Sequence, residues 1–100
     1  EEYEKFEEIM NDLVATRALN VLDDQLEVEA RAPVENTSSV NVDTGYAVLV
    51  DGEIDEKIVG LAESLGAEFA IGRDKSGTAN SSSVSILTDD KIKKVKASNT

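Results

Sequence analysis

Three carboxylates follow one another closely at Asp51, Glu53 and Asp55, directly after the apolar run 46–50. That run is long enough for a strand covered on both faces, and an Asp-Gly corner ends it before a helix begins. Oxygen ligands at the carboxyl end of such a strand could hold a hard cation such as Mg²⁺ for phosphoryl transfer. The alternative is structural: Asp51 caps the next helix, and the other acids favour its positive N-terminal end.

An acid that follows Asp-Gly at a strand end resembles the Toprim metal motif, in which paired acids hold Mg²⁺ for phosphoryl transfer. The chain departs from that motif because Glu53 stands where the motif has Asp, and no upstream Glu-Gly strand end supplies a third carboxylate. The calcium-loop pattern is also missing, since the cluster has no Gly at the sixth place and no Glu at the twelfth. We therefore favour the structural interpretation and expect no cofactor in this domain.

Cations gather toward the C-terminus. Residues 1–72 hold 4 basic and 18 acidic side chains, a balance of −14, whereas residues 73–100 hold 6 and 3, a balance of +3. The segment 72–77 offers Arg73, Lys75, a hydroxyl and glycines, which could cradle an anion, although it lacks the Gly-Lys-Ser/Thr of a Walker loop. Together with Lys94 these are the candidates for contact with an RNA backbone. The alternative is a solvated surface loop, and the acidic remainder repels phosphates.

The composition excludes several classes of site. The chain has no cysteine and no histidine, which rules out disulfides, thiolate metal sites and Ser-His or Cys-His nucleophiles. One hundred residues with 40% hydrophobic side chains suit a single domain, which we expect over 1–96 with a tail at 97–100. No apolar stretch is long enough to cross a bilayer, so we expect a cytoplasmic protein. The first residue is Glu, which suggests a piece of a longer protein.

The N-terminal half predicts a helix followed by a hairpin. An apolar stripe at spacings of three and four marks one helix face over about residues 2–15: Tyr3, Phe6, Ile9, Met10, Leu13 and Val14. We expect a strand over 17–22, a turn at 23–25 and a second strand over 26–34. In the second strand apolar residues alternate with charged residues and Pro33. Pro33 should end the pairing or lie at an edge, because it has no amide hydrogen.

The C-terminal half predicts a strand, a helix and further strands. Segment 35–45 is a loop with a short strand possible at Val40 and Val42, and 46–50 is a buried strand. A helix over 54–65 stops at Gly66, and a strand at 67–72 then implies a parallel strand-helix-strand crossover. A loop at 73–83, a strand at 84–87 and a short helix after the N-cap Thr88 complete the chain. We predict an α/β fold (α+β is possible) with a small mixed sheet of four to five strands, an N-terminal helix and a short C-terminal helix.

Several short segments resemble the C-terminal domain of archaeal DnaG-type primases. The first are the run Leu13-Val14-Ala15-Thr16-Arg17-Ala18-Leu19-Asn20-Val21-Leu22-Asp23 and the alternating strand 27–34. The others are Val48-Leu49-Val50-Asp51-Gly52-Glu53-Ile54, Leu65-Gly66-Ala67-Glu68-Phe69-Ala70-Ile71-Gly72 and Val84-Ser85-Ile86-Leu87-Thr88. The resemblance covers about residues 5–90. The chain departs from it after Asp51-Gly52, where Asp55 and Glu56 replace a Thr-Gln-like continuation, and in the serine-rich loop 72–83.

The resemblance implies that a parent protein makes RNA primers with a central Toprim domain and is also associated with the archaeal exosome. Mg²⁺ and the catalytic acids would belong to that Toprim domain, so no catalytic position transfers to this chain. We expect a non-catalytic accessory domain of a DNA primase in DNA replication and exosome-associated RNA processing. Its partners would be replication or exosome proteins, with RNA contact possible and no membrane. The alternative is a small Mg²⁺-dependent Toprim-like domain that uses Asp51, Glu53 and Asp55.

Overall fold

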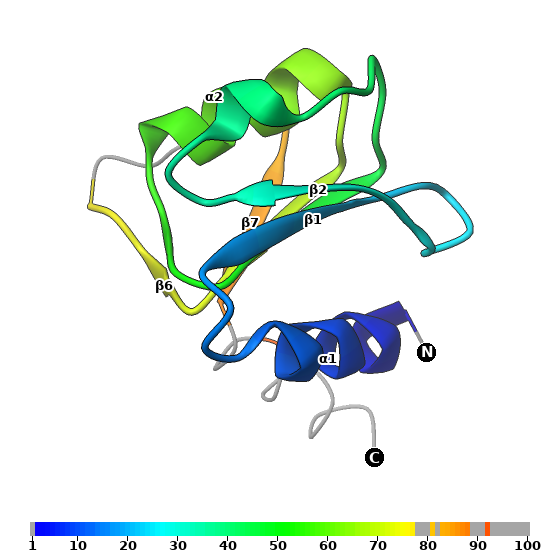
Figure 1. The fold of residues 1–100 in the computed structure, drawn as a ribbon, viewed down its shortest axis with the longest axis vertical. Helices are drawn as coiled ribbons and strands as arrows, with labels where there is room; N and C mark the ends of the chain where they lie inside the picture. Colours follow the sequence, from blue (N-terminus) through cyan, green and yellow to red (C-terminus); the bar gives the residue numbers. More distant parts are fainter. Residues whose placement is uncertain (1, 78–80, 82, 89–91, 93–100) are drawn as a thin grey trace.

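Two helices cover opposite faces of a five-stranded mixed sheet (Figure 1). The computed structural model describes residues 2–77, 81, 83–88 and 92. The helices are α1 (Glu2–Leu13) and α2 (Glu56–Leu65), and the strands of the main sheet are β1 (Ala18–Leu22), β2 (Val28–Pro33), β3 (Ala47–Val50), β5 (Phe69–Gly72) and β7 (Ser85–Thr88). Two short strands, β4 (Glu53–Ile54) and β6 (Asp74–Lys75), form a second, parallel sheet.

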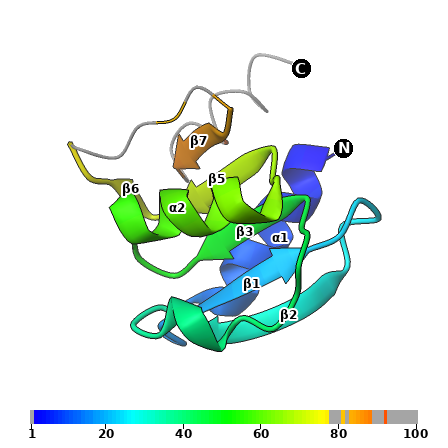
Figure 2. The same cartoon turned by 90° about the horizontal axis from the view of Figure 1, so that it is seen from above.

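The strand order in the main sheet is β2-β1-β3-β5-β7. Strand β1 pairs antiparallel with both β2 and β3, whereas β3, β5 and β7 run parallel to one another. Figure 2 shows this order across the sheet, with α2 on the near face and α1 on the far face. The predicted α/β class, the mixed sheet, the N-terminal helix and the parallel crossover from β3 through α2 to β5 are confirmed.

The sheet separates two apolar cores, because successive side chains of a strand point to opposite faces. Leu19 and Val21 of β1 face α2, whereas Ala18 and Leu22 face α1. Strand β3 divides in the same way, and all its side chains are buried. The core under α1 receives the apolar stripe of that helix: Phe6, Ile9, Met10 and Leu13.

The first helix is shorter than the sequence predicts. It ends at Leu13, and Val14, which we expected on its buried stripe, is 58% exposed. The chain turns away because Ala15 and Arg17 adopt positive φ angles of 65° and 52°, which no α-helix can continue. The side chain of Tyr3 lies outside the described residues.

The second helix begins later than expected. Ile54, which we placed on the helix, belongs to β4 and is buried in the core under α2. The N-cap is Asp55, so the prediction that Asp51 caps the helix is wrong. Gly66 ends the helix at φ 69°, as its left-handed preference predicts.

The connecting segments differ in detail from the predictions. Val40 and Val42 form no strand; they pack, partly buried, against the α2-side core after the 3₁₀ helix η1 (Thr37–Ser39). The expected loop after Gly72 contains the short strand β6. Thr88 ends β7, and the helix predicted after it lies largely outside the described residues, as does the tail 97–100. No helix in the described part is long and apolar enough to cross a membrane.

Strand β2 lies at one edge of the main sheet, and two features interrupt its ladder. Pro33 is its last residue, as expected for a residue without an amide hydrogen. The pairing passes from Val21 opposite Ala30 to Leu22 opposite Val28, which leaves Glu29 as an extra residue in a β-bulge. Most of this strand is exposed, and only Ala32 is buried in the core.

Candidate functional site at the carboxyl end of the sheet

The three carboxylates singled out from the sequence lie on three different structural elements. Asp51 follows the last residue of β3, Glu53 lies in β4, and Asp55 caps α2. The sharp change of direction after β3 separates them, because β4 leaves the main sheet to pair with β6. Each carboxylate therefore has its own surroundings.

Asp51 forms an ion pair with Arg73 at the carboxyl edge of the sheet. The Arg73 Nε donates to Asp51 Oδ1 at 3.1 Å, and the backbone N–H of Arg17 donates to Asp51 Oδ2 at 2.9 Å. The same guanidinium donates through Nη2 to the carbonyl oxygen of Met10. These contacts join four segments: α1, the link into β1, the end of β3 and the end of β5.

The surroundings of Asp51 favour its ionised form. Partial burial alone would raise the pKa of this carboxyl, because it penalises the charge. The hydrogen bond from the Arg17 backbone and the hydrogen bond and positive charge of Arg73 outweigh that effect and lower the pKa below the ordinary value of 3.8. A carboxylate held in this way stabilises the fold as an anion.

Asp55 is the N-cap of α2, and Glu53 is exposed to solvent. The Asp55 Oδ1 accepts hydrogen bonds from the backbone N–H groups of Lys57 at 3.0 Å and Ile58 at 3.1 Å, which is the geometry of an N-cap. Glu53 is exposed, and Asp74 stands opposite it in the pairing of β4 with β6. Within the described part of the chain, no three carboxylates are arranged to hold a metal ion.

The cations predicted to contact an anion are not equivalent. The side chain of Arg73 is 26% exposed and is bonded to Asp51 and Met10. Lys75 is exposed in β6, where its backbone N–H donates to the carboxylate of Asp74. Lys94 lies outside the described residues. Arg73 thus holds the fold together, and Lys75 is the described candidate whose charge faces solvent.

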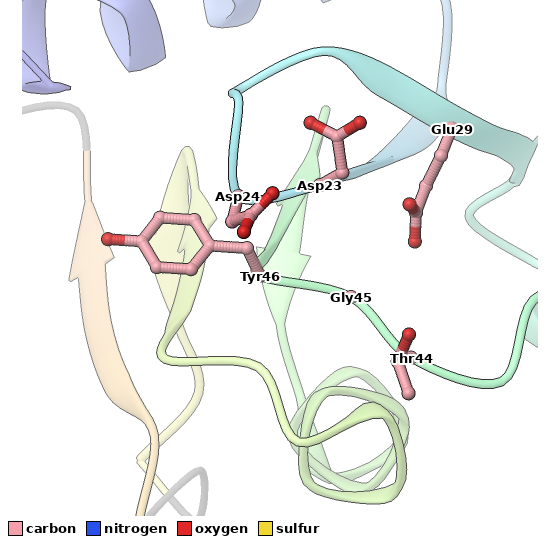
Figure 3. Close-up of a pocket in the computed structure, with 6 residues that line it drawn as sticks. All are labelled: Asp23, Asp24, Glu29, Thr44, Gly45 and Tyr46. Atoms are coloured by element: carbon pink, nitrogen blue, oxygen red, sulfur yellow. The ribbon is translucent and has the colours of Figure 1, made fainter.

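A surface hollow of about 410 Å³ lies where the β1–β2 turn meets the segment before β3 (Figure 3). Six residues line it, three of them with carboxylates: Asp23, Asp24, Glu29, Thr44, Gly45 and Tyr46. The side chains of Glu29 and Thr44 point toward one another, whereas the Tyr46 ring points away from them. The Asp23 carboxylate is engaged in the turn, since it accepts from the backbone N–H groups of Gln25 and Glu27.

Sequence reasoning did not identify this hollow. The sequence does contain a signal for it: the polar segments 23–25 and 43–45 flank β1 and β3, two strands that pair with each other. Tyr46 N–H donates to the carbonyl oxygen of Leu22 at 2.7 Å, which brings the two segments together. Their meeting follows from the β1–β3 pairing, which the sequence pattern alone did not specify.

Comparison of the chain with models of protein families, with curated proteins and with solved structures finds no significant match in any of the three.

Proposed function

We propose that this chain is a non-catalytic interaction domain of an archaeal DnaG-like primase. In this proposal the domain associates with replication or exosome proteins in the cytoplasm and has no cofactor of its own. Primer synthesis, and the Mg²⁺ that it needs, belong to a Toprim domain elsewhere in the parent protein. The basis is the resemblance of the apolar segments described above, together with the chemistry at the carboxyl edge of the sheet.

The observation that best supports a non-catalytic role is the contact between Asp51 and Arg73. Open α/β sheets bind ligands at the carboxyl ends of their strands, and this is where Asp51 lies. Its two oxygens accept from Arg17 and Arg73, and Asp55 is used as a helix cap. A Mg²⁺ site would have to compete with these contacts for the same oxygens.

Glu53→Gln provides the cleanest test against the phosphoryl-transfer alternative. Glu53 is exposed, so this change removes a possible ligand while it leaves the contacts of Asp51 and Asp55 in place. We expect isothermal titration of the isolated chain with MgCl₂ to show no binding tighter than about 1 mM in either form. Tighter binding that disappears in Glu53→Gln would contradict a non-catalytic role.

The association role is tested in the full-length parent protein. Deletion of residues 1–96 should leave primer synthesis in place and abolish co-purification with the exosome. Loss of primer synthesis with intact exosome association would contradict the proposal. A Toprim domain in the coding region upstream of Glu1 is a further requirement.

RNA contact is a separate part of the proposal and is best tested at Lys75 and Lys94. Arg73 is left unchanged, because its replacement would break the ion pair with Asp51. We expect Lys75→Glu with Lys94→Glu to weaken RNA binding and to reduce its salt dependence. Lys5→Glu with Lys57→Glu, two charge reversals at exposed lysines of α1 and α2, is the matched control. Equal effects of the control and the double variant would rule out a specific contact.

A further inference from the structure

The negative charge of this protein is concentrated on its surface. The chain carries 21 acidic and 10 basic side chains, a net charge of −11 in 100 residues. Among the described residues the only buried polar or charged side chain is Asn20, so every described carboxylate is at least partly exposed to solvent. Such a charge keeps a protein soluble but destabilises its compact state through self-repulsion.

Helix α1 places like charges next to one another. Glu4, Glu8 and Asp12 follow at intervals of four, and all three are exposed. Residues at this spacing are neighbours on a helix surface, with about 5–6 Å between their Cβ atoms. Asp12 also lies in the last turn, which contains no basic residue and where the helix dipole disfavours a negative charge. Lys5 lies three residues before Glu8 and offsets part of this repulsion, whereas Glu8 and Asp12 remain a like-charge pair near the end of the helix.

Like charges also meet outside this helix, within the β1–β2 hairpin and between the short strands β4 and β6. Asp23, Asp24 and Glu29 line one hollow (Figure 3). Glu53 stands opposite Asp74 in the pairing of β4 with β6, where a charge of the opposite sign would stabilise the pair. Folding brings Glu53 next to Asp74 and Glu29 next to the β1–β2 turn, so the repulsion between these groups acts against the folded state.

Salt at ordinary concentrations screens charges at these separations only in part. The Debye length is about 10 Å at 0.1 M and about 3 Å at 1 M ionic strength, so it falls well below the spacing of neighbouring carboxylates as the salt concentration approaches 1 M. The two cores consist mostly of aliphatic side chains, and the chain has four aromatic residues and no tryptophan. Burial of large aromatic side chains therefore contributes little stability to offset the repulsion.

We propose that this fold depends on molar concentrations of monovalent salt, and that the domain works in a salt-rich cytoplasm. Hydrated alkali cations act by screening the carboxylates collectively and not at one binding site. This inference does not rest on the proposed role in a primase.

Thermal unfolding of the whole chain, followed by circular dichroism from about 0.05 M to about 2 M KCl, tests the inference. We expect the wild-type Tm to rise by more than about 10 °C over this range. A Tm that stays constant or falls would overturn the proposal.

Two substitutions at exposed charged residues distinguish screening of charges from a general effect of salt on the burial of apolar side chains. Asp12→Lys turns a repulsive pair into an attractive one, because Glu8 then precedes a lysine by four residues, which is the favourable order. This variant should raise the Tm at low salt and flatten its rise. Lys57→Gln removes an exposed cation from α2 and should steepen the rise. Parallel curves for both variants and the wild type would show that salt acts through apolar burial, which contradicts the proposal.

Discussion

Asp51 and Arg73 form an ion pair across the two central parallel strands, with a separation of 22 residues in the sequence. The register of β3 and β5 explains this contact. Ala47 pairs with Phe69 and Leu49 with Ile71, the same separation of 22, so the residues that follow the two strands are brought side by side. The pair then reaches α1 through the Met10 carbonyl, which fixes that helix on the sheet.

Asp51→Asn should destabilise the fold, because it removes the charge that Arg73 and the Arg17 amide stabilise. Hydrogen bonds to charged groups contribute about 1.5–3 kcal/mol, so we expect the free energy of unfolding to fall by about 2 kcal/mol. Urea unfolding monitored by circular dichroism measures this difference in the free energy of unfolding. Asp43→Asn, at an exposed loop carboxylate, is the control and should change stability little. A loss in Asp51→Asn no larger than that in Asp43→Asn would show that the ion pair makes no specific contribution to stability.

The same carboxylate predicts a pH dependence. Its pKa in the folded state is lowered from 3.8, so its stabilising contribution is complete above that value and is lost as the pH falls through the lower, folded pKa. The difference in unfolding free energy between wild type and Asp51→Asn should therefore be constant near neutral pH and shrink below about pH 4. Urea titrations from about pH 6 to about pH 2 would show it. A difference that grows on acidification would refute the lowered pKa.

Asp55→Ala should cost about 1 kcal/mol, because two backbone N–H groups at the start of α2 lose their acceptor. Asp55→Ser keeps an N-cap oxygen and should restore most of this stability. Thermal unfolding of the three proteins under one set of conditions gives the comparison. If alanine and serine are equivalent, the cap has no energetic role.

Asn20 is buried, and its Oδ1 has no hydrogen-bond partner among the described residues. An unsatisfied buried polar group costs about 1–3 kcal/mol. Asn20→Leu, on the face of β1 toward α1, should therefore raise the free energy of unfolding by about 1 kcal/mol. The same replacement at the exposed Asn41 is the control and should give no gain. A loss of stability in Asn20→Leu would show that the amide has a partner in solution.

Much of the fold could be predicted from hydrophobic periodicity and turn residues. The apolar stripe predicted α1, the alternating pattern predicted β2, and Gly66 predicted the end of α2. Their boundaries were correct to within a few residues. The errors occurred where tertiary packing decided the outcome. Ile54 has helical spacing with Ile58, yet the chain bends after Val50 and places it in a short strand instead.

The candidate site was less predictable than the fold. An acid just before a helix is a candidate N-cap, and both Asp51 and Asp55 fit that description. In the structure the N-cap is Asp55. The role of Asp51 depends on Arg73, which comes near it only when two strands adopt a particular register. The assignment of Arg73 to RNA contact likewise rested on its charge, without knowledge of its intramolecular partners.

The interruptions in β2 bear on the behaviour of this protein in crowded solutions. An exposed sheet edge offers its free backbone groups to strands of other molecules and thus promotes aggregation. Pro33 has no amide to offer, and the extra residue Glu29 distorts the edge and places a charge there. The domain can therefore leave this border of its sheet open to solvent and still resist edge-to-edge polymerisation.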